Sequence, residues 1–147
     1  MNSYKGFTLI ELIVVITVLG ILVSVAAPRF VALQSDARKA VMQGVEASLR
    51  GAATLVYSKA LIEGKEATAS GQSITVENAS VSLVYGYPSA DSIAKLITIE
   101  KNGNIVFGAP STGKVVIEYT NANQCTVTYY EATSLKAATV TGDYSSC

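Results

Sequence analysis

Glu11 is the one charged side chain in an apolar run of 21 residues that extends from Phe7 to Ala27. A helix of this length reaches about 31 Å, close to the thickness of the hydrocarbon core of a bilayer. A carboxylate in that medium costs on the order of a few kcal/mol, so its presence predicts a specific cationic partner. Two simpler alternatives are a capping box with Thr8 at the start of the helix and a side chain that reaches the membrane surface.

The sequence lacks side chains on which many enzyme mechanisms depend. The chain has no histidine and two cysteines among 147 residues, so His/Cys metal sites and histidine-dependent triads are excluded. We therefore expect no catalytic residue, no cofactor site and no metal site, and we predict that the protein is not an enzyme. Eleven basic side chains balance eleven acidic ones without a basic stripe, so bulk charge does not indicate nucleic acid as a partner.

Both cysteines, Cys125 and Cys147, fall late in the chain. An even number of cysteines in a chain that reaches an oxidising compartment indicates a disulfide. Such a bond would close a loop of about 23 residues and contribute roughly 3 kcal/mol by the chain-entropy estimate. The alternative is a pair of independent buried thiols.

The six residues before the apolar run, Met1 to Gly6, carry one positive charge at Lys5 and end in glycine. A secretory signal peptide would instead be cut after its apolar core, for which Ser24-Val25-Ala26 offers small residues. The apolar stretch is too long for that interpretation, contains a carboxylate and is followed at once by Pro28. Cleavage after the apolar run is therefore the less favoured alternative.

The string Lys5-Gly6-Phe7-Thr8-Leu9-Ile10-Glu11-Leu12 closely resembles the processing motif of type IV prepilins. The resemblance implies that a membrane prepilin peptidase cuts between Gly6 and Phe7 on the cytoplasmic side and that the new amine of Phe7 is methylated. It also implies that Glu11 attracts the amino-terminal nitrogen of a neighbouring subunit during assembly. In this family, the amino-terminal nitrogen of the neighbouring subunit is therefore the cationic partner that a carboxylate in a bilayer is expected to have.

Further segments look like the mannose-sensitive haemagglutinin (MSHA) type of pilin. They are Ala27-Pro28-Arg29-Phe30, Gly51-Ala52-Ala53, Val56-Tyr57-Ser58-Lys59-Ala60 and Gly86-Tyr87-Pro88. The resemblance implies an inner-membrane precursor, inner-membrane pilus assembly machinery, a helical homo-oligomeric filament outside the cell and a role in surface attachment. It also implies a disulfide in the carboxy-terminal loop, and loss of helical structure between Gly20 and Pro28 in the fibre.

The elements that must position these residues begin with one long bent helix from Phe7 to about Leu61, ended by Gly64. Its first half is expected in lipid, and its second half is amphipathic and is expected to pack on a sheet. The expected packing stripe recurs every three or four residues and comprises Leu33, Ala37, Val41, Val45, Leu49, Ala52 and Val56. Arg38 falls near the apolar edge of that stripe, while Glu46 and Arg50 are spaced for an ion pair on the other face.

The remainder predicts an antiparallel sheet. We expect strand character over Ser73 to Tyr85, and a hairpin at Asn102-Gly103 between Lys95 to Glu100 and Ile105 to Gly108. A second hairpin is predicted between Lys114 to Thr120 and Cys125 to Glu131, and a short helix over Ser92 to Leu96. The predicted class is an α+β pilin fold with a disulfide-closed carboxy-terminal loop.

The predicted domains are a leader at 1–6, a membrane and filament-core helix at 7–29 and a globular head at 30–147. The predicted function is a structural subunit of a bacterial type IV pilus. One alternative is a minor pilin or a type II secretion pseudopilin, which shares the same anchor. Another is a membrane-anchored periplasmic binding module that never polymerises and has no need of Glu11.

Overall fold

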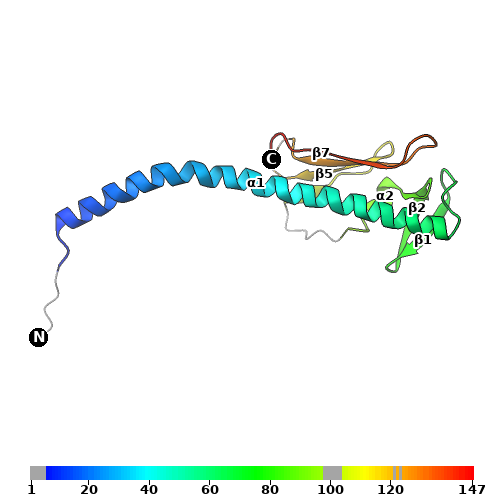
Figure 1. Cartoon of the computed structure of the whole chain (residues 1–147), viewed down its shortest axis with the longest axis horizontal. Helices are drawn as coiled ribbons and strands as arrows, with labels where there is room; N and C mark the ends of the chain where they lie inside the picture. The colour runs from blue at the N-terminus through cyan, green and yellow to red at the C-terminus, as the bar shows by residue number, and fades with distance from the viewer. Residues whose placement is uncertain (1–5, 98–103, 121, 123) are drawn as a thin grey trace, which may run out of the picture. The chain divides into compact units, whose positions relative to one another are not determined.

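The computed structural model describes residues 6–97, 104–120, 122 and 124–147. The chain divides into two units, Met1–Asp36 and Ala37–Cys147, which are taken in turn. The elements are α1 (Leu9–Ile62), β1 (Gln72–Val76), β2 (Ala79–Val84), β3 (Tyr87–Pro88), α2 (Ala90–Ile93), β4 (Ile105–Phe107), β5 (Lys114–Tyr119), β6 (Thr126–Tyr130) and β7 (Thr139–Asp143) (Figure 1).

The first unit is the amino-terminal part of α1. The helix begins at Leu9, two residues later than predicted, and continues without interruption through Gly20 and Pro28. Every described residue from Gly6 to Ala37 is exposed. By length and composition, α1 is the one helix in the described part of the chain that could cross a membrane.

The end of α1 follows the prediction that Gly64 stops the helix. Gly64 adopts a left-handed conformation with φ of 65°, which glycine reaches without the strain that a Cβ atom would add. Its N–H donates to the Leu61 carbonyl at 3.2 Å, and the Lys65 N–H donates to the Ala60 carbonyl at 2.9 Å. This pair of bonds is the Schellman motif, which satisfies carbonyls that the last turn leaves free.

The second unit contains two antiparallel sheets where the sequence predicted one. A three-stranded sheet has the order β1-β2-β3, and a four-stranded sheet has the order β4-β5-β6-β7. Buried residues alternate with exposed or half-buried ones along β1, β2, β5 and β6, as period-two patterning requires. The predicted hairpin between Lys114 to Thr120 and Cys125 to Glu131 is confirmed as β5 and β6.

The second half of α1 packs on both sheets in succession. Met42, Val45, Leu49 and Ala53 contribute to a core with α2 and the four-stranded sheet. Val56 and Ala60 contribute to a second core with β1 and β2. The spacing of three and four residues between these positions keeps them on one helix face.

The packing stripe begins later along α1 than predicted. Leu33, Ala37 and Val41 are exposed, and the first buried position is Met42. Val45, Leu49 and Val56 are buried as expected, whereas the predicted position Ala52 is half-buried and its neighbour Ala53 is buried. Hydrophobic periodicity identifies the side of a helix that can pack, but it does not indicate how far along the helix the packing partner extends.

Three predictions for the middle of the chain are corrected. Ser73 to Tyr85 is a hairpin of β1 and β2, because Glu77 and Asn78 both have positive φ and form a two-residue turn. Lys95 to Ile97 were predicted as part of a strand but are not strand. The predicted short helix begins and ends earlier, as α2. The predicted strand at Ile105 to Gly108 is present as β4, and it pairs with β5. The predicted turn at Asn102-Gly103 lies outside the described residues.

The helix α2 is capped from another element. Ser89 precedes it but makes no side-chain capping bond, and the Ala90 N–H instead donates to Oε1 of Glu131 at 2.6 Å. Tyr129 on β6, the strand that ends just before Glu131, donates its hydroxyl to the Pro88 carbonyl at 2.6 Å. These two bonds tie the four-stranded sheet to the segment that connects the two sheets.

The carboxy-terminal loop is closed by a disulfide between Cys125 and Cys147, whose Cα atoms lie 4.8 Å apart. The alternative of two free thiols is therefore wrong. A long apolar amino-terminal helix, antiparallel sheets and this disulfide fit the predicted α+β pilin fold.

Candidate functional site

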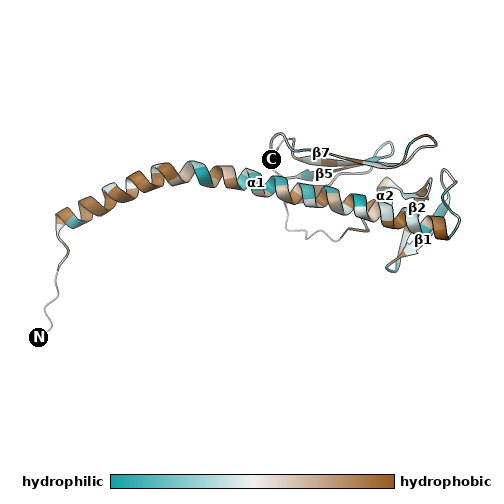
Figure 2. Cartoon of the chain, in the orientation of Figure 1, coloured by the Kyte–Doolittle hydropathy of each residue, from teal (hydrophilic) through white to brown (hydrophobic). Residues whose placement is uncertain are grey.

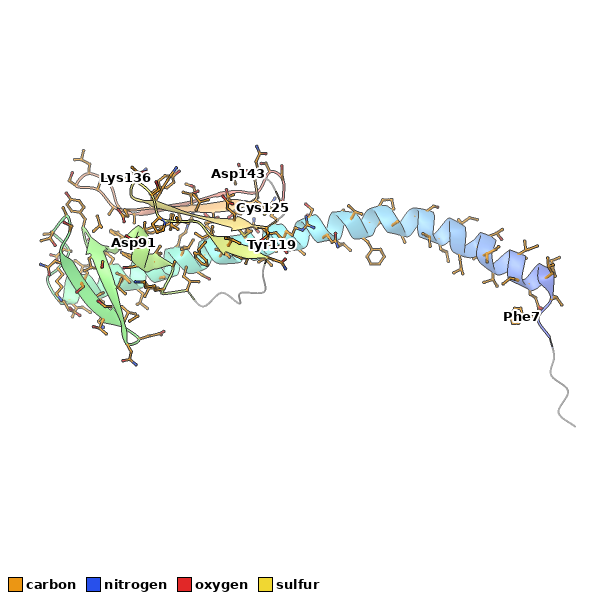
Figure 3. The ribbon with its side chains drawn as sticks, turned by 180° about the vertical axis from the view of Figure 1, so that it is seen from behind. Phe7, Asp91, Tyr119, Cys125, Lys136 and Asp143 are labelled. Carbon is orange, nitrogen blue, oxygen red and sulfur yellow. A yellow bond between two sulfur atoms is a disulfide. The ribbon has the colours of Figure 1, made fainter. Side chains whose placement is uncertain are left out.

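The peptide bond between Gly6 and Phe7 lies in an exposed segment before the first helical residue. Phe7 is 82% exposed, and apart from Gly6 and its chain neighbours no described residue has a heavy atom within 4 Å of the position that a Cβ on Gly6 would take. Figure 3 labels Phe7 at the start of α1. Non-helical, exposed backbone of this kind is where proteases cut, so the predicted cleavage position is accessible.

Glu11 closes a capping box with Thr8. The Thr8 N–H donates to Oε2 of Glu11 at 2.9 Å, the Thr8 hydroxyl donates to the same oxygen at 2.7 Å, and the Glu11 N–H donates to Thr8 Oγ1 at 3.3 Å. The capping alternative considered from the sequence is therefore confirmed. Both bonds to the carboxylate end on Oε2, so Oε1 accepts no hydrogen bond from the described residues.

The charge of Glu11 has no partner within the described chain. The ion pairs there are Glu46 with Arg50 and Glu63 with Lys65. The next basic residue along the described helix is Arg29, about 27 Å away at the rise of an α-helix. A capping box satisfies hydrogen-bonding groups but supplies no positive charge.

Around Glu11 the helix presents a continuous apolar surface. Figure 2 shows this part of α1 as almost wholly hydrophobic. Its large side chains are between 47% and 82% exposed from Phe7 to Val31, and none of the most apolar window is buried. An exposed apolar surface of this extent marks a region that lipid or another protein must cover.

Gly20 and Pro28 lie farther along the same helix and are not brought close to Glu11. Both are helical residues here, and nothing lies within 4 Å of a Cβ built at Gly20. Pro28 has no N–H, so the carbonyl four residues earlier, that of Ser24, lacks its usual helical donor. Glycine and proline have the lowest helix propensities, yet the helix continues through both positions.

A second cluster joins the disulfide-closed loop to α1. Arg50 pairs with Glu46 as predicted and also donates to the Val140 carbonyl at 3.1 Å, while the Tyr144 hydroxyl donates to Glu46 Oε2. Burial raises the pKa of Tyr144 to about 12, and its hydrogen bond to Glu46 acts in the same direction. The sequence analysis identified the Glu46 and Arg50 pair but missed Tyr144, because no spacing rule links residues 98 positions apart.

Arg38, which the sequence analysis placed near the apolar edge of the packing stripe, contacts Cys147 and Tyr119. Its Nη1 donates to the Cys147 carbonyl at 3.5 Å, and its guanidinium carbon lies 5.8 Å from the centre of the Tyr119 ring. A cation over an aromatic face is stabilising. Arg38 therefore contacts both the end of the loop that the disulfide closes and Tyr119 on β5; Figure 3 labels Cys125 and Tyr119.

The described residues hold no group of three or more His, Cys, Asp or Glu side chains placed to bind a metal ion. The functional chemistry that the described geometry offers is charge pairing at Glu11 and burial of the apolar helix surface.

Comparison with known proteins points to one family. Residues 1–27 match the family described as the prokaryotic N-terminal methylation motif. The type IV narrow pilus major component PilA5 of Thermus thermophilus is 46% identical over 61 residues, which are 42% of this chain and 49% of that protein. The type IV major alpha-pilin of Moraxella bovis is 43% identical over 75 residues, which are 51% of this chain and 45% of that protein.

The chain spans about half the length of the curated relatives it matches, and no solved structure matches it. These relatives are type IV pilins, and neither carries an MSHA designation. The chain thus carries the type IV pilin N-methylation motif and is homologous to type IV pilins over about half of its length.

Proposed function

We propose that this protein is a structural subunit of a bacterial type IV pilus. The observation that carries the proposal is the exposed apolar helix surface from Phe7 onward, which contains a single carboxylate without a cation in the described chain. Exposed apolar area costs about 25 cal/mol per Å² in water. Lipid covers that surface before assembly, and neighbouring helices cover it in a filament.

The chemistry of assembly follows from cleavage between Gly6 and Phe7. Cleavage creates an amine at Phe7, which is then methylated, and this cation pairs with Glu11 of a neighbouring subunit. Opposite charges attract more strongly in a water-poor environment than in water. An unpaired charge is heavily penalised there, so the pairing sets the register in which helices dock.

The capping box supports this role rather than competing with it. Thr8 hydrogen-bonds one carboxylate oxygen and leaves Oε1 available to an ammonium group. A carboxylate that accepts bonds on both oxygens is better satisfied in an apolar medium. Thr8 thus holds the Glu11 side chain at the start of α1, where the neighbour's amine arrives.

The proposed life cycle assigns a place to each segment. Residues 1–6 are the leader that a prepilin peptidase removes, residues 7–29 form the membrane-spanning and later filament-core helix, and residues 30–147 form the head. The precursor lies in the inner membrane, the pilus assembly machinery there extracts it, and the filament is extracellular. Surface attachment is the role that the resemblance to MSHA-type pilins suggests.

Gly20 and Pro28 belong to the same proposal. The segment between them is weak in helix propensity, by about 1 kcal/mol for glycine and about 3 kcal/mol for proline relative to alanine. We expect it to lose helical structure in the assembled fibre, where neighbours can satisfy freed backbone groups. A density map of the filament with continuous helix from Val18 to Phe30 would contradict this expectation.

The test of the proposed function replaces Glu11 with alanine in the full chain. Loss of one partner from a buried ion pair costs about 3–5 kcal/mol, which corresponds to at least about a hundredfold weaker docking. We expect the Glu11→Ala precursor to be made and cleaved, and surface filaments recovered by shearing to be lost. The matched control is Glu118→Ala, which removes an exposed carboxylate from β5 and should leave filaments unchanged.

Amino-terminal sequencing of the sheared wild-type subunit is expected to begin at methylated Phe7. Normal filaments from Glu11→Ala would rule out the charge-pairing mechanism. An anchored binding module would be unaffected by that substitution and would yield no sheared fibre at all. A minor pilin or pseudopilin would be absent from the bulk of the sheared polypeptide.

A further inference from the structure

Leu135 is the most exposed large apolar side chain among the described residues of the head. It is 97% exposed at the tip of the turn between β6 and β7. The turn is well ordered by hydrogen bonds, because the Thr133 N–H donates to the Lys136 carbonyl at 2.8 Å and the Lys136 N–H donates to Thr133 Oγ1 at 3.2 Å. Leu135 is therefore an apolar knob on a defined support rather than a side chain on a loose loop.

A groove large enough for a leucine side chain lies between α1 and the β1–β2 hairpin. Its volume is about 150 Å³. Its apolar lining consists of Ala52, Leu55, Val56, Val76, Ala79 and Leu96. Leu55 is 56% exposed beside it, so the groove leaves apolar surface in water. An apolar cavity of about 150 Å³ holds a molecule the size of benzene, so a leucine side chain fits.

The knob and the groove lie on opposite sides of α1. Leu55 lines the groove, whereas Tyr57 lies with Tyr85 and Leu135 around a separate surface depression. Residues two apart on a helix are rotated by about 200°, so Leu55 and Tyr57 point in opposite directions. In Figure 1 the β1–β2 hairpin projects from one side of α1 and the turn leading to β7 lies on the other.

Charge at the two places is complementary. Lys136 follows Leu135 directly, and Glu77 stands at the rim of the groove in the β1–β2 turn. Neither side chain makes an ion pair with another described residue of the chain, and Glu77 is exposed. The other charged residue at the groove, Lys95, would repel a second lysine, so Lys136 is directed toward the Glu77 side.

We propose that Leu135 of one copy of this chain inserts into the groove beside Leu55 of the next copy, with Lys136 paired to Glu77. The inference rests on the proposed function, because it names the head contact through which assembled copies touch. A knob and a groove on different faces form a heterologous contact, which leaves one free knob and one free groove after every addition. Such a contact extends a helical filament instead of closing a dimer.

Cysteine cross-linking in intact filaments tests the geometry. Ala79 lines the groove and Leu135 is the knob, so the double variant Ala79→Cys, Leu135→Cys should form disulfides between successive copies on mild oxidation. We expect a ladder of dimers, trimers and longer products on non-reducing gels. Each single variant alone should stay monomeric, and filaments assembled from a mixture of the two should yield dimers only.

The matched control pairs Ala79→Cys with Val106→Cys, an exposed apolar position on β4 away from both knob and groove, and it should give no ladder. Wild-type filaments without any ladder from the double variant would overturn this contact and leave the proposed function standing. Dimers from Leu135→Cys alone would overturn it as well, because they require knob-to-knob contact. Absence of wild-type filaments would instead reject the proposed function.

A charge exchange provides a second readout that does not depend on cysteine. We expect Glu77→Lys and Lys136→Glu each to reduce sheared filament severalfold and the double exchange to restore it. Leu135→Ser should reduce it about tenfold, the effect of losing one well-buried interface anchor. Leu135 and Lys136 are surface residues, so the head should fold normally in these variants. Failure of the double exchange to restore filaments would overturn the contact.

Discussion

Glu11 caps the start of α1 and, in the proposed assembly, also pairs with the Phe7 amine of a neighbouring subunit. Its bonds with Thr8 start the helix, and its unused oxygen and its charge are available to a partner that the described chain does not contain. From the sequence, the capping box is a simpler interpretation of Glu11 that does not exclude an ion pair. The geometry shows that they are compatible, because a carboxylate has more acceptor sites than Thr8 can occupy.

At the same scale, Tyr144 makes the stability of the head sensitive to alkaline pH. A tyrosine in an unfolded chain titrates near pH 10, whereas burial and the bond to Glu46 hold the pKa of Tyr144 at about 12 in the folded head. Because the folded pKa is the higher one, the stability contribution is fully present below pH 10. It is lost as the pH rises from about 10 to about 12.

The measurement is the thermal unfolding temperature of the full chain in detergent between pH 8 and pH 12. We expect Tyr144→Phe to be less stable than wild type at pH 8 and to lose less of its stability above pH 10. Tyr129, whose pKa burial also raises, remains in both proteins and contributes equally to each curve. Parallel curves would show that Tyr144 is not the group responsible.

At the scale of elements, two glycines of the α1 region respond oppositely to the same substitution. Gly64 has φ of 65°, where a Cβ costs about 1–2 kcal/mol, so Gly64→Ala should destabilise the head by roughly that amount. Gly51 is an exposed helical residue with nothing within 4 Å of its built Cβ, so Gly51→Ala should stabilise by about 0.5–1 kcal/mol.

Denaturant unfolding of both variants in the same detergent measures the two changes. Each variant serves as the control for the other, because both add one methyl group to the same helix region. A stabilising Gly64→Ala would mean that the Schellman motif does not form in solution.

Elements with local signals were predictable from the sequence, and elements without them were not. The end of α1 has Gly64, and the β5–β6 hairpin has polar residues between two apolar runs. The β1–β2 turn was missed because Glu77 takes a positive φ that usually indicates glycine or asparagine. β7 was missed because Val140 is its one buried residue, so no apolar alternation is visible.

The residues of the candidate site were likewise predictable only where the sequence carries a local signal. Glu11 was found because one charge in an apolar run is conspicuous, and the cysteines were found by counting. The links from Tyr144 to Glu46 and from Arg38 to the Cys147 carbonyl were not predictable, because they join positions about a hundred residues apart. Such contacts depend on how two sheets are arranged on a helix, which local patterns do not specify.

At the scale of the whole molecule, the disulfide should decide how stable the head is. Cys125 and Cys147 are 22 positions apart and are both buried against the larger core. By the chain-entropy estimate, replacing both by serine should lower the free energy of unfolding by about 3 kcal/mol. The two serines also place hydroxyls in an apolar core, which acts in the same direction.

Denaturant unfolding of the full chain in detergent checks this value. The control is wild-type protein unfolded with and without a reductant, which separates loss of the cross-link from the effect of the serine hydroxyls. We expect reduction alone to account for most of the change. If the reduced wild type is as stable as the oxidised protein, the cross-link does not stabilise the head.

Within the described chain, the buried core begins at Met42, and no side chain of the preceding apolar run contributes to it. In the proposed function, the head can therefore complete its folding while residues 7–29 are still surrounded by lipid. Under that proposal, precursor chains stored in the bilayer need no further folding of the head before assembly. If the proposed fibre is dismantled, its subunits would return with the head already folded and could be used again.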